Sequence, residues 1–169
     1  RIQRFAQEYP EYSFEEAIDH IKPDVLIGAT GVAGTFNEAI IRKMTQANQR
    51  PVIIALSNPT SHTECTAEQA YQWSGGQVIF ASGSPFGPVC YAGEWFRPAQ
   101  GNNAYIYPGV GLGVYASSAR LVTQRMFLKA AEILAQSVTG QELNAGAIYP
   151  SPPRVRAVSH AIAVTICRV

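Results

Sequence analysis

The chain has 169 residues, 47% of them hydrophobic and 15% charged, so it can bury one sizeable core and lacks the composition of a disordered protein. Its formal net charge is +1 and its Lys and Arg residues are scattered, which excludes the basic stripe that nucleic-acid binding needs. No apolar run is long enough to cross a bilayer, so we expect neither nucleic acid nor a membrane as partner.

The cysteines and the chain ends indicate a compartment and a context. Cys65, Cys90 and Cys167 are odd in number and show no CxxC spacing, and we expect no signal peptide. We therefore expect buried or half-buried thiols in a reducing, soluble compartment. Because the chain begins at Arg1 without Met and ends in an apolar helical pattern without a cap, we also expect it to be a piece of something longer.

Hydrophobic periodicity and turn residues predict the elements in chain order. Short runs rich in β-branched residues predict strands at 24–27, 51–56 and 77–80, covered on both faces, and helical patterns lie at 13–21, 37–47 and 67–73. Residues 83–103 predict a long irregular excursion with a small hairpin near 91–96. Nearly uncharged residues 104–119 predict a buried helix that Pro108 kinks or breaks, and two more helices are expected at 123–137 and 153–169.

Alternating strands and helices predict an α/β fold, a Rossmann-like parallel sheet flanked by helices, with C-terminal helices added and only part of a domain present. Each predicted strand is followed by a short polar loop, at 29–31, 57–60 and 81–85. Ligands bind beyond the carboxyl ends of parallel strands, so the three loops are expected to converge on a binding site.

Two glycine motifs resemble a dinucleotide fingerprint without matching it. The turn Gly28–Gly34 follows a strand and precedes a helix, but it reads GxxGxxG and no acidic residue follows about 20 positions on. It either supplies backbone freedom only or borders a cofactor through Thr30 and Gly31. The string Gly109–Gly113 has no strand before it and indicates close helix packing instead.

Asparagines end two of the loops. Asn58 offers two N–H donors without a formal charge, which suits a carboxylate or a nicotinamide amide, and Asn102 and Asn103 repeat this at the end of the long excursion. His20, His62 and His160 lack triad or metal-ligand spacing, and Glu64, Glu68 and Glu94 are scattered. We therefore predict no paired acid and base and no metal cluster in this chain.

Four ordered blocks carry a family resemblance: residues 50–60 (RPVIIALSNPT), 64–71 (ECTAEQAY), 80–86 (FASGSPF) and 100–109 (QGNNAYIYPG). Together they resemble malic enzyme, in the C-terminal part of its NAD(P)-binding domain, and the similarity runs from about Phe14 to the end. This implies that residues 1–169 are a fragment of that domain whose catalytic part lies upstream.

The resemblance implies a parent protein that oxidises (S)-malate with NAD or NADP and decarboxylates the product to pyruvate with Mg or Mn. It implies that Asn58, Asn102 and Asn103 bind substrate, with Asn58 and Asn103 also contacting the cofactor. Thr30, Gly31 and Ser57 would border the cofactor. The family's catalytic Tyr and Lys and its three acidic metal ligands cannot be assigned here, so the catalytic and metal residues lie outside this chain and the isolated chain is expected to be inactive.

Alternatives remain open at this point. One alternative is a malolactic enzyme, which resembles malic enzyme in sequence but releases lactate. A second is a non-catalytic module that binds a nucleotide or forms an oligomer. The residues that choose NAD over NADP are not recognisable. A homo-oligomeric parent in the cytoplasm is what the resemblance implies, with mitochondria and plastids as the other compartments of the family.

Overall fold

A computed structural model describes residues 11–169; the first ten residues of the predicted 1–169 domain lie outside the described part. The sheet strands are β1 (Val25–Gly28), β2 (Val52–Ala55), β3 (Ile79–Ser82) and β6 (Ala99–Gln100), and the hairpin strands are β4 (Val89–Tyr91) and β5 (Glu94–Phe96). The α-helices are α1 (Phe14–Ile21), α2 (Glu38–Ala47), α3 (Ala67–Ser74), α4 (Tyr107–Ala116), α5 (Gln124–Gln136), α6 (Gly140–Asn144) and α7 (Val155–Ile166). Short 3₁₀ turns are η2 (Thr60–His62), η3 (Asn103–Tyr105) and η4 (Pro152–Arg154).

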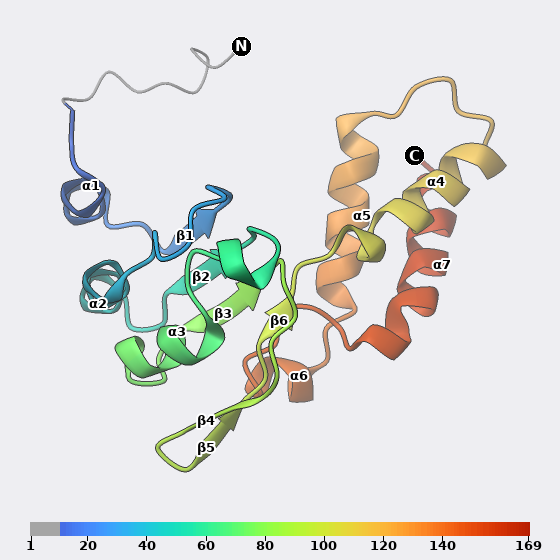
Figure 1. Cartoon of the computed structure of the whole chain (residues 1–169). Coiled ribbons are helices and arrows are strands. Elements are labelled where there is room, and N and C mark those ends of the chain that lie inside the picture. The colour runs from blue at the N-terminus through green and yellow to red at the C-terminus, as the bar shows by residue number, and fades with distance from the viewer. Residues whose placement is uncertain (1–10) are drawn as a thin grey trace.

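The sheet is parallel, with strand order β1-β2-β3-β6. Its register aligns Gly28 with Ala55, and Ala55 with Ser82, so these strands end at one level. Figure 1 shows this sheet and α1 to α3 as one unit beside a second unit of α4, α5 and α7. The predicted Rossmann-like α/β fold is confirmed. Strand β6, which follows the hairpin, was not predicted because two residues carry too little periodicity.

Local chemistry explains why the first three helices begin where they do. Ser13 accepts from the backbone N–H of Glu16 while the Glu16 carboxylate accepts from the backbone N–H of Ser13, which is the predicted capping box. Thr66 and Gln69 form the same arrangement at α3, and Asn37 caps α2. Each cap satisfies backbone donors that a helix start leaves without partners.

The helices α1, α2 and α3 cover one face of the sheet. Their buried side chains form a core with Ile53, Ala55 and Phe80, which share that face. On the opposite face, Val25 is 46% exposed and Ile27 is 60% exposed. The expectation that every strand is covered on both faces is therefore wrong for β1, because β1 is the edge of the sheet and no helix of the described residues packs on this face.

The C-terminal helices form a second core, in which α4 packs along α7. Added Cβ atoms at Gly109 and Gly113 would meet side-chain carbons of Ile162 and Ile166 at 2.7 and 2.6 Å, which confirms the predicted close packing. The predicted helix over 104–119 is shorter. Pro108 stands in the first turn of α4 and so begins the helix instead of kinking it, since a missing N–H costs nothing there.

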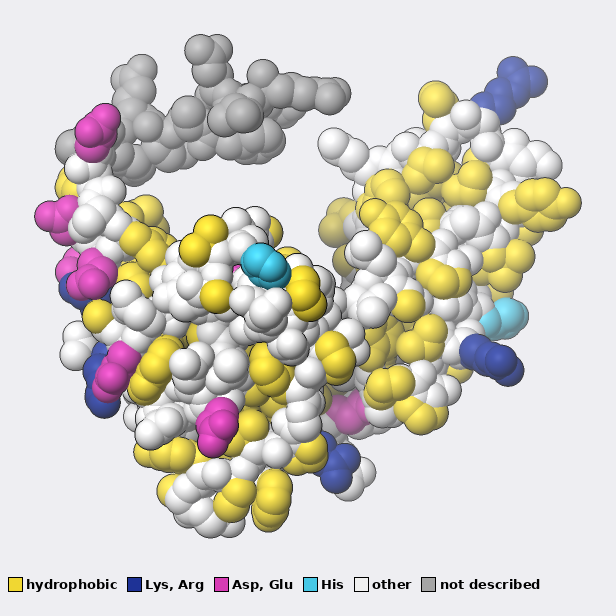
Figure 2. All heavy atoms as spheres, in the orientation of Figure 1, with side chains coloured by type: hydrophobic (Ala, Val, Ile, Leu, Met, Phe, Trp, Pro, Cys, Tyr) yellow, Lys and Arg dark blue, Asp and Glu magenta, His cyan; other side chains and the backbone are white. Residues whose placement is uncertain are grey.

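Helices α4 and α5 and the segment between them expose a large apolar surface, visible as the yellow side chains on the right of Figure 2. The most exposed of these side chains is Tyr115 at 85%, and the others include Tyr107, Leu112, Leu121, Val122 and Leu128. Exposed apolar surface of this extent is typical of regions that contact another surface.

Candidate functional site

The loops after β1, β2 and β3 meet at the carboxyl edge of the sheet, as predicted. The Gly31 N–H donates to the Ser57 hydroxyl over 2.9 Å, which joins the first loop to the second. The Ser84 hydroxyl donates to the side-chain oxygen of Asn58 over 2.7 Å, which joins the second loop to the third. Residues Thr30, Gly31, Ser57 and Asn58, separated in the sequence by a strand and a helix, are thereby brought together.

Glu64, which the sequence analysis dismissed as scattered, holds this arrangement together. Its side chain is fully buried, and one carboxylate oxygen accepts from the Thr30 N–H (2.8 Å), the Thr30 hydroxyl (3.0 Å) and the Ser57 hydroxyl (2.5 Å). Its other oxygen accepts from the Ser57 N–H at 3.3 Å. A buried carboxylate with this many donors is an organising group, and it lies behind both predicted cofactor loops.

The hydrogen bonds also determine the charge state of Glu64. Burial raises the pKa of its carboxyl group, but the hydrogen bonds from the Ser57 hydroxyl and from Thr30 outweigh burial and lower the pKa below the ordinary value of 4.5. Glu64 is therefore ionised at neutral pH. Its neighbour Cys65 responds in the opposite way, since burial and the Glu64 charge raise the pKa of that thiol to about 12.

Asn58 is exposed and its amide is oriented from two sides. Its NH₂ group donates to the Leu56 carbonyl oxygen at 3.2 Å, and its oxygen accepts from the buried Ser84 hydroxyl. The amide has a second N–H for which the described residues supply no partner. The side chain is thus fixed in orientation while one donor remains for a ligand, as a carboxylate or carboxamide site requires.

Asn102 and Asn103 follow β6 and lie on the same side of the sheet. The Gly101 N–H donates to the Ser82 carbonyl oxygen, which continues the ladder from β3. Asn102 uses its side-chain oxygen to accept from the Ala104 N–H at 2.9 Å as the cap of η3, and both asparagines are exposed. No hydrogen bond among the described residues joins either of them to Asn58.

The Gly28–Gly34 turn is built differently from a phosphate cradle. Gly31 and Gly34 adopt positive φ of 69° and 74°, which confirms that the turn needs the freedom of glycine. The N–H groups that would face a phosphate are occupied, however, since that of Thr30 donates to Glu64, that of Gly31 to Ser57 and that of Val32 to the Thr30 hydroxyl. His62 adds a contact to the Gly31 carbonyl oxygen at 3.0 Å.

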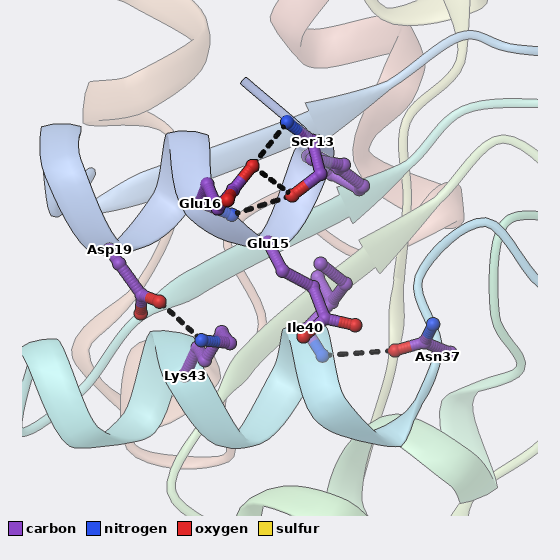
Figure 3. Close-up of a pocket in the computed structure, with 8 residues that line it drawn as sticks. Ser13, Glu15, Glu16, Asp19, Asn37, Ile40 and Lys43 are labelled. Carbon is purple, nitrogen blue, oxygen red and sulfur yellow. Dashed lines mark hydrogen bonds and ion pairs between the residues drawn. The ribbon is translucent and has the colours of Figure 1, made fainter.

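Two further cavities are present, and the second of them borders this edge through Pro85 and Gln100. One, of about 340 Å³ between α1 and α2, is lined by polar groups that bind one another: Figure 3 shows the Lys43–Asp19 ion pair and the Ser13–Glu16 cap. The other, of about 670 Å³, lies beside β6 and α6 and is lined by Arg97, Tyr105 and Tyr149 among others. Neither contains any predicted site residue.

The thiols differ from expectation. Cys65 is buried as predicted, but Cys90 on the hairpin and Cys167 after α7 are exposed, so the expectation of buried or half-buried thiols is wrong for these two. Cys90 lies in a sheet of two strands and Cys167 follows the last residue of α7, so few neighbouring side chains bury either thiol.

Comparison with protein families decides what kind of domain this is. The model that describes the NAD-binding domain of malic enzymes matches residues 2–169. The chain belongs to the malic enzyme family. Among its relatives, the chloroplastic NADP-dependent malic enzyme of Zea mays is 50% identical over 157 residues, which is 93% of this chain and 25% of that protein. The NADP-dependent malic enzyme of Dictyostelium discoideum is 46% identical over 158 residues, 94% of this chain and 29% of that protein.

The solved malic enzyme of Pyrococcus horikoshii Ot3 has the same fold, with a TM-score of 0.58 at 25% identity over 86% of this chain and 30% of that one. This malic enzyme chain therefore spans about a quarter of the length of the curated relatives it matches.

Among residues 11–169, no three His, Cys, Asp or Glu side chains are grouped so as to hold a metal ion. Within the same range, no helix combines the length and the apolar character that crossing a membrane requires.

Proposed function

We propose that this chain is the C-terminal part of the NAD(P)-binding domain of a malic enzyme that oxidises (S)-malate and decarboxylates it to pyruvate and CO₂ while NAD or NADP is reduced. The observation that carries the proposal is the joining of the Thr30–Gly31, Ser57–Asn58 and Ser84 loops at one edge of a parallel sheet in a member of this family. The names of the maize and Dictyostelium relatives favour NADP.

The residues present fit one end of a dinucleotide and not the other. The N–H groups of Thr30 and Gly31 are occupied and an ionised carboxylate lies behind them, which opposes an anionic pyrophosphate. Uncharged amides at Asn58, Asn102 and Asn103 suit the carboxamide of a nicotinamide and a carboxylate of malate. We therefore assign the nicotinamide and substrate end to this chain, and the pyrophosphate to residues outside it.

In this assignment, Asn58 donates one amide N–H to the substrate or to the carboxamide, held in place by Ser84. Asn103 contacts the same ligands from the neighbouring strand end, and Asn102 contacts malate. Thr30, Gly31 and Ser57 border the cofactor. The nicotinamide, when bound, supplies a hydride acceptor; the role of this chain's residues is to orient the two reactants, which accounts for a large part of a rate enhancement.

The metal that the family implies does not fit the described residues, because none of their carboxylates and imidazoles form a cluster. No metal-dependent step is assigned to them. We propose that Mg or Mn, and the acid and base of the reaction, are held by residues of the parent outside this chain, and that the 169-residue chain alone does not oxidise malate.

The test is an assay of the full-length parent with (S)-malate, Mn and either NAD or NADP, following reduced cofactor, pyruvate and lactate. Reduced cofactor with pyruvate supports the proposal and gives the cofactor preference. Lactate without free reduced cofactor indicates a malolactic enzyme, and no turnover indicates a non-catalytic module. Malate-dependent turnover by the isolated chain contradicts its predicted inactivity.

We further propose that the parent is a homo-oligomer. The exposed apolar side chains of α4 and α5 support an interface there. Light scattering of the purified parent tests this proposal, and a monomer contradicts it. The cytoplasm remains our predicted compartment, while the maize relative's name favours a plastid; imaging of a fluorescent fusion of the parent distinguishes them.

A further inference from the structure

The directions of the hydrogen bonds around Glu64 can be assigned from chemistry alone. The N–H groups of Thr30 and Ser57 can only donate, so both carboxylate oxygens act as acceptors. The Ser57 oxygen accepts from the Gly31 N–H, which leaves the Ser57 hydrogen to donate to Glu64 at 2.5 Å. The Thr30 oxygen accepts from the Val32 N–H and likewise donates to Glu64. Every assigned partner is a donor, as an ionised carboxylate requires.

Among residues 11–169, no cationic side chain forms an ion pair with this carboxylate. The ion pairs of the described residues involve Glu38, Asp19, Glu132 and Glu142, and none involves Glu64. The groups that contact Glu64 are neutral hydroxyls and backbone N–H groups. A full negative charge is therefore buried behind the two loops that border the proposed nicotinamide site, where its field is screened less than that of a surface charge.

Hydrogen-bond donors alone would not require a charge here, since a neutral glutamine could accept from some of them. What the charge adds is a preference between ligands of different charge. The oxidised nicotinamide ring is a cation and the reduced ring is neutral, whereas the rest of the dinucleotide carries the same charge in both forms. A buried anion attracts the first ring and is indifferent to the second.

We propose that Glu64 is a positioning residue whose buried negative charge makes this edge of the sheet favour the oxidised nicotinamide ring over the reduced one. The inference rests on the proposed function, because it takes the ring to bind at the Thr30–Gly31 and Ser57 loops. In this role Glu64 touches neither reactant. Its hydrogen bonds hold the Thr30 and Ser57 loops in place, and the field of its charge favours capture of the oxidised cofactor and release of the reduced one.

The test measures dissociation constants of the oxidised and reduced forms of NAD and NADP for the full-length protein, by titration calorimetry. The quantity of interest is the ratio of the two constants for the same nucleotide. Glu64→Gln should lower the preference for the oxidised form by roughly three- to ten-fold. The matched control Glu68→Gln removes the same charge from an exposed position on α3 and should leave the ratio unchanged.

A second variant separates charge from geometry. Ser57→Ala removes the 2.5 Å hydrogen bond but keeps the carboxylate, so it should weaken both forms by the same factor and preserve the ratio. Glu64→Gln that weakens both forms equally shows a structural role only and overturns the proposal. If Glu64→Gln does not fold, the dissociation constants of the unsubstituted protein provide the test. Equal constants for the reduced and the oxidised nucleotide would overturn the proposal. Failure of every nucleotide to bind overturns the proposed function itself.

Discussion

Gly28 lies against Glu64 so closely that a Cβ atom at residue 28 would meet the Glu64 carboxyl carbon at 2.7 Å. The last residue of β1 is thus a glycine because the buried carboxylate occupies the space a side chain would need. The same Cβ would meet the Phe36 ring at 2.7 Å, so the ring closes the space from the other side.

Gly28→Ala should therefore destabilise the chain by about 1–3 kcal/mol, as overpacking a rigid core does. The free energy of unfolding, from urea titration followed by tryptophan fluorescence, measures the loss. Gly87→Ala is the matched control, because no atom lies within 4 Å of its added Cβ, and it should change stability by less than about 0.5 kcal/mol. Equal stabilities of the two variants would contradict the close packing.

Three glycines of α4 make a second, internally controlled series. Cβ atoms at Gly109 and Gly113 would meet α7 at 2.7 and 2.6 Å, whereas one at Gly111 would meet nothing within 4 Å. Gly109→Ala and Gly113→Ala should each lose about 1–3 kcal/mol, because the helices must move apart. Gly111→Ala should gain about 0.5–1 kcal/mol, because alanine lowers the entropy cost of a helix. Thermal unfolding of the three variants gives the order, and a loss at Gly111 would refute it.

The sequence predicted the edge of the sheet better than it predicted the group that organises it. Loops that follow β-branched runs can be predicted to lie together, because the carboxyl ends of parallel strands meet at one edge of the sheet. The loops that contain Thr30, Ser57 and Asn58 were predicted in this way. Glu64 was missed because its partners lie in two loops, and residue 30 is 34 positions away from it. No local pattern marked it, because a charged residue in the segment between β2 and α3 is ordinary on a solvated loop.

Burial was harder to predict than element type. The runs at 24–27 and 51–56 look alike in composition, but Ile27 is 60% exposed whereas Ile54, its register partner on the same face of the sheet, is half-buried. Which strand lies at the edge of a sheet depends on strand order, and no local pattern encodes strand order. The same reason applies to β6, whose two residues pair with β3 only because the excursion returns to it.

Glu142 should make stability depend on acid. The Thr139 N–H and the Ser151 N–H bind its carboxylate and lower its pKa from 4.5 to about 2. A group whose pKa is lower when folded stabilises the folded state above the unfolded pKa, and this contribution is lost as pH falls from about 4.5 to about 2. Urea midpoints measured between pH 7 and pH 2 should fall less steeply in Glu142→Gln than in the unsubstituted chain. Glu94→Gln, at an exposed hairpin position, should keep the full acid dependence.

Thiol labelling should separate the three cysteines. Cys90 and Cys167 are exposed, whereas Cys65 is 1% exposed and burial raises its pKa to about 12, so its reactive thiolate is scarce. Iodoacetamide at pH 8 should add two labels to the native chain and three in urea, as counted by mass spectrometry of the intact chain. A third label added to the native chain as fast as the first two would show that the core around Cys65 is open.

Ser84 and Asn58 should act as a unit in the full-length protein. The Ser84 hydroxyl, 1% exposed, donates to the Asn58 oxygen at 2.7 Å and fixes which way the amide faces. Ser84→Ala removes a hydrogen bond that contributes about 1 kcal/mol, so it should lower kcat/KM for malate about five-fold. Asn58→Ala, which removes the proposed ligand donor itself, should lower it at least ten-fold, as the loss of an oriented donor does.

The double variant distinguishes this orienting role from a general loss of stability. If Ser84 acts only through Asn58, adding Ser84→Ala to Asn58→Ala should cost almost nothing more, since a shared partner makes the two effects non-additive. Ser74→Ala is the matched control: Ser74 is also buried, but its hydroxyl donates to the Tyr71 carbonyl oxygen within α3. It should leave kcat/KM unchanged. Additive losses from Ser84→Ala and Asn58→Ala would contradict this role, because they would mean that Ser84 affects turnover by a route other than its hydrogen bond to Asn58.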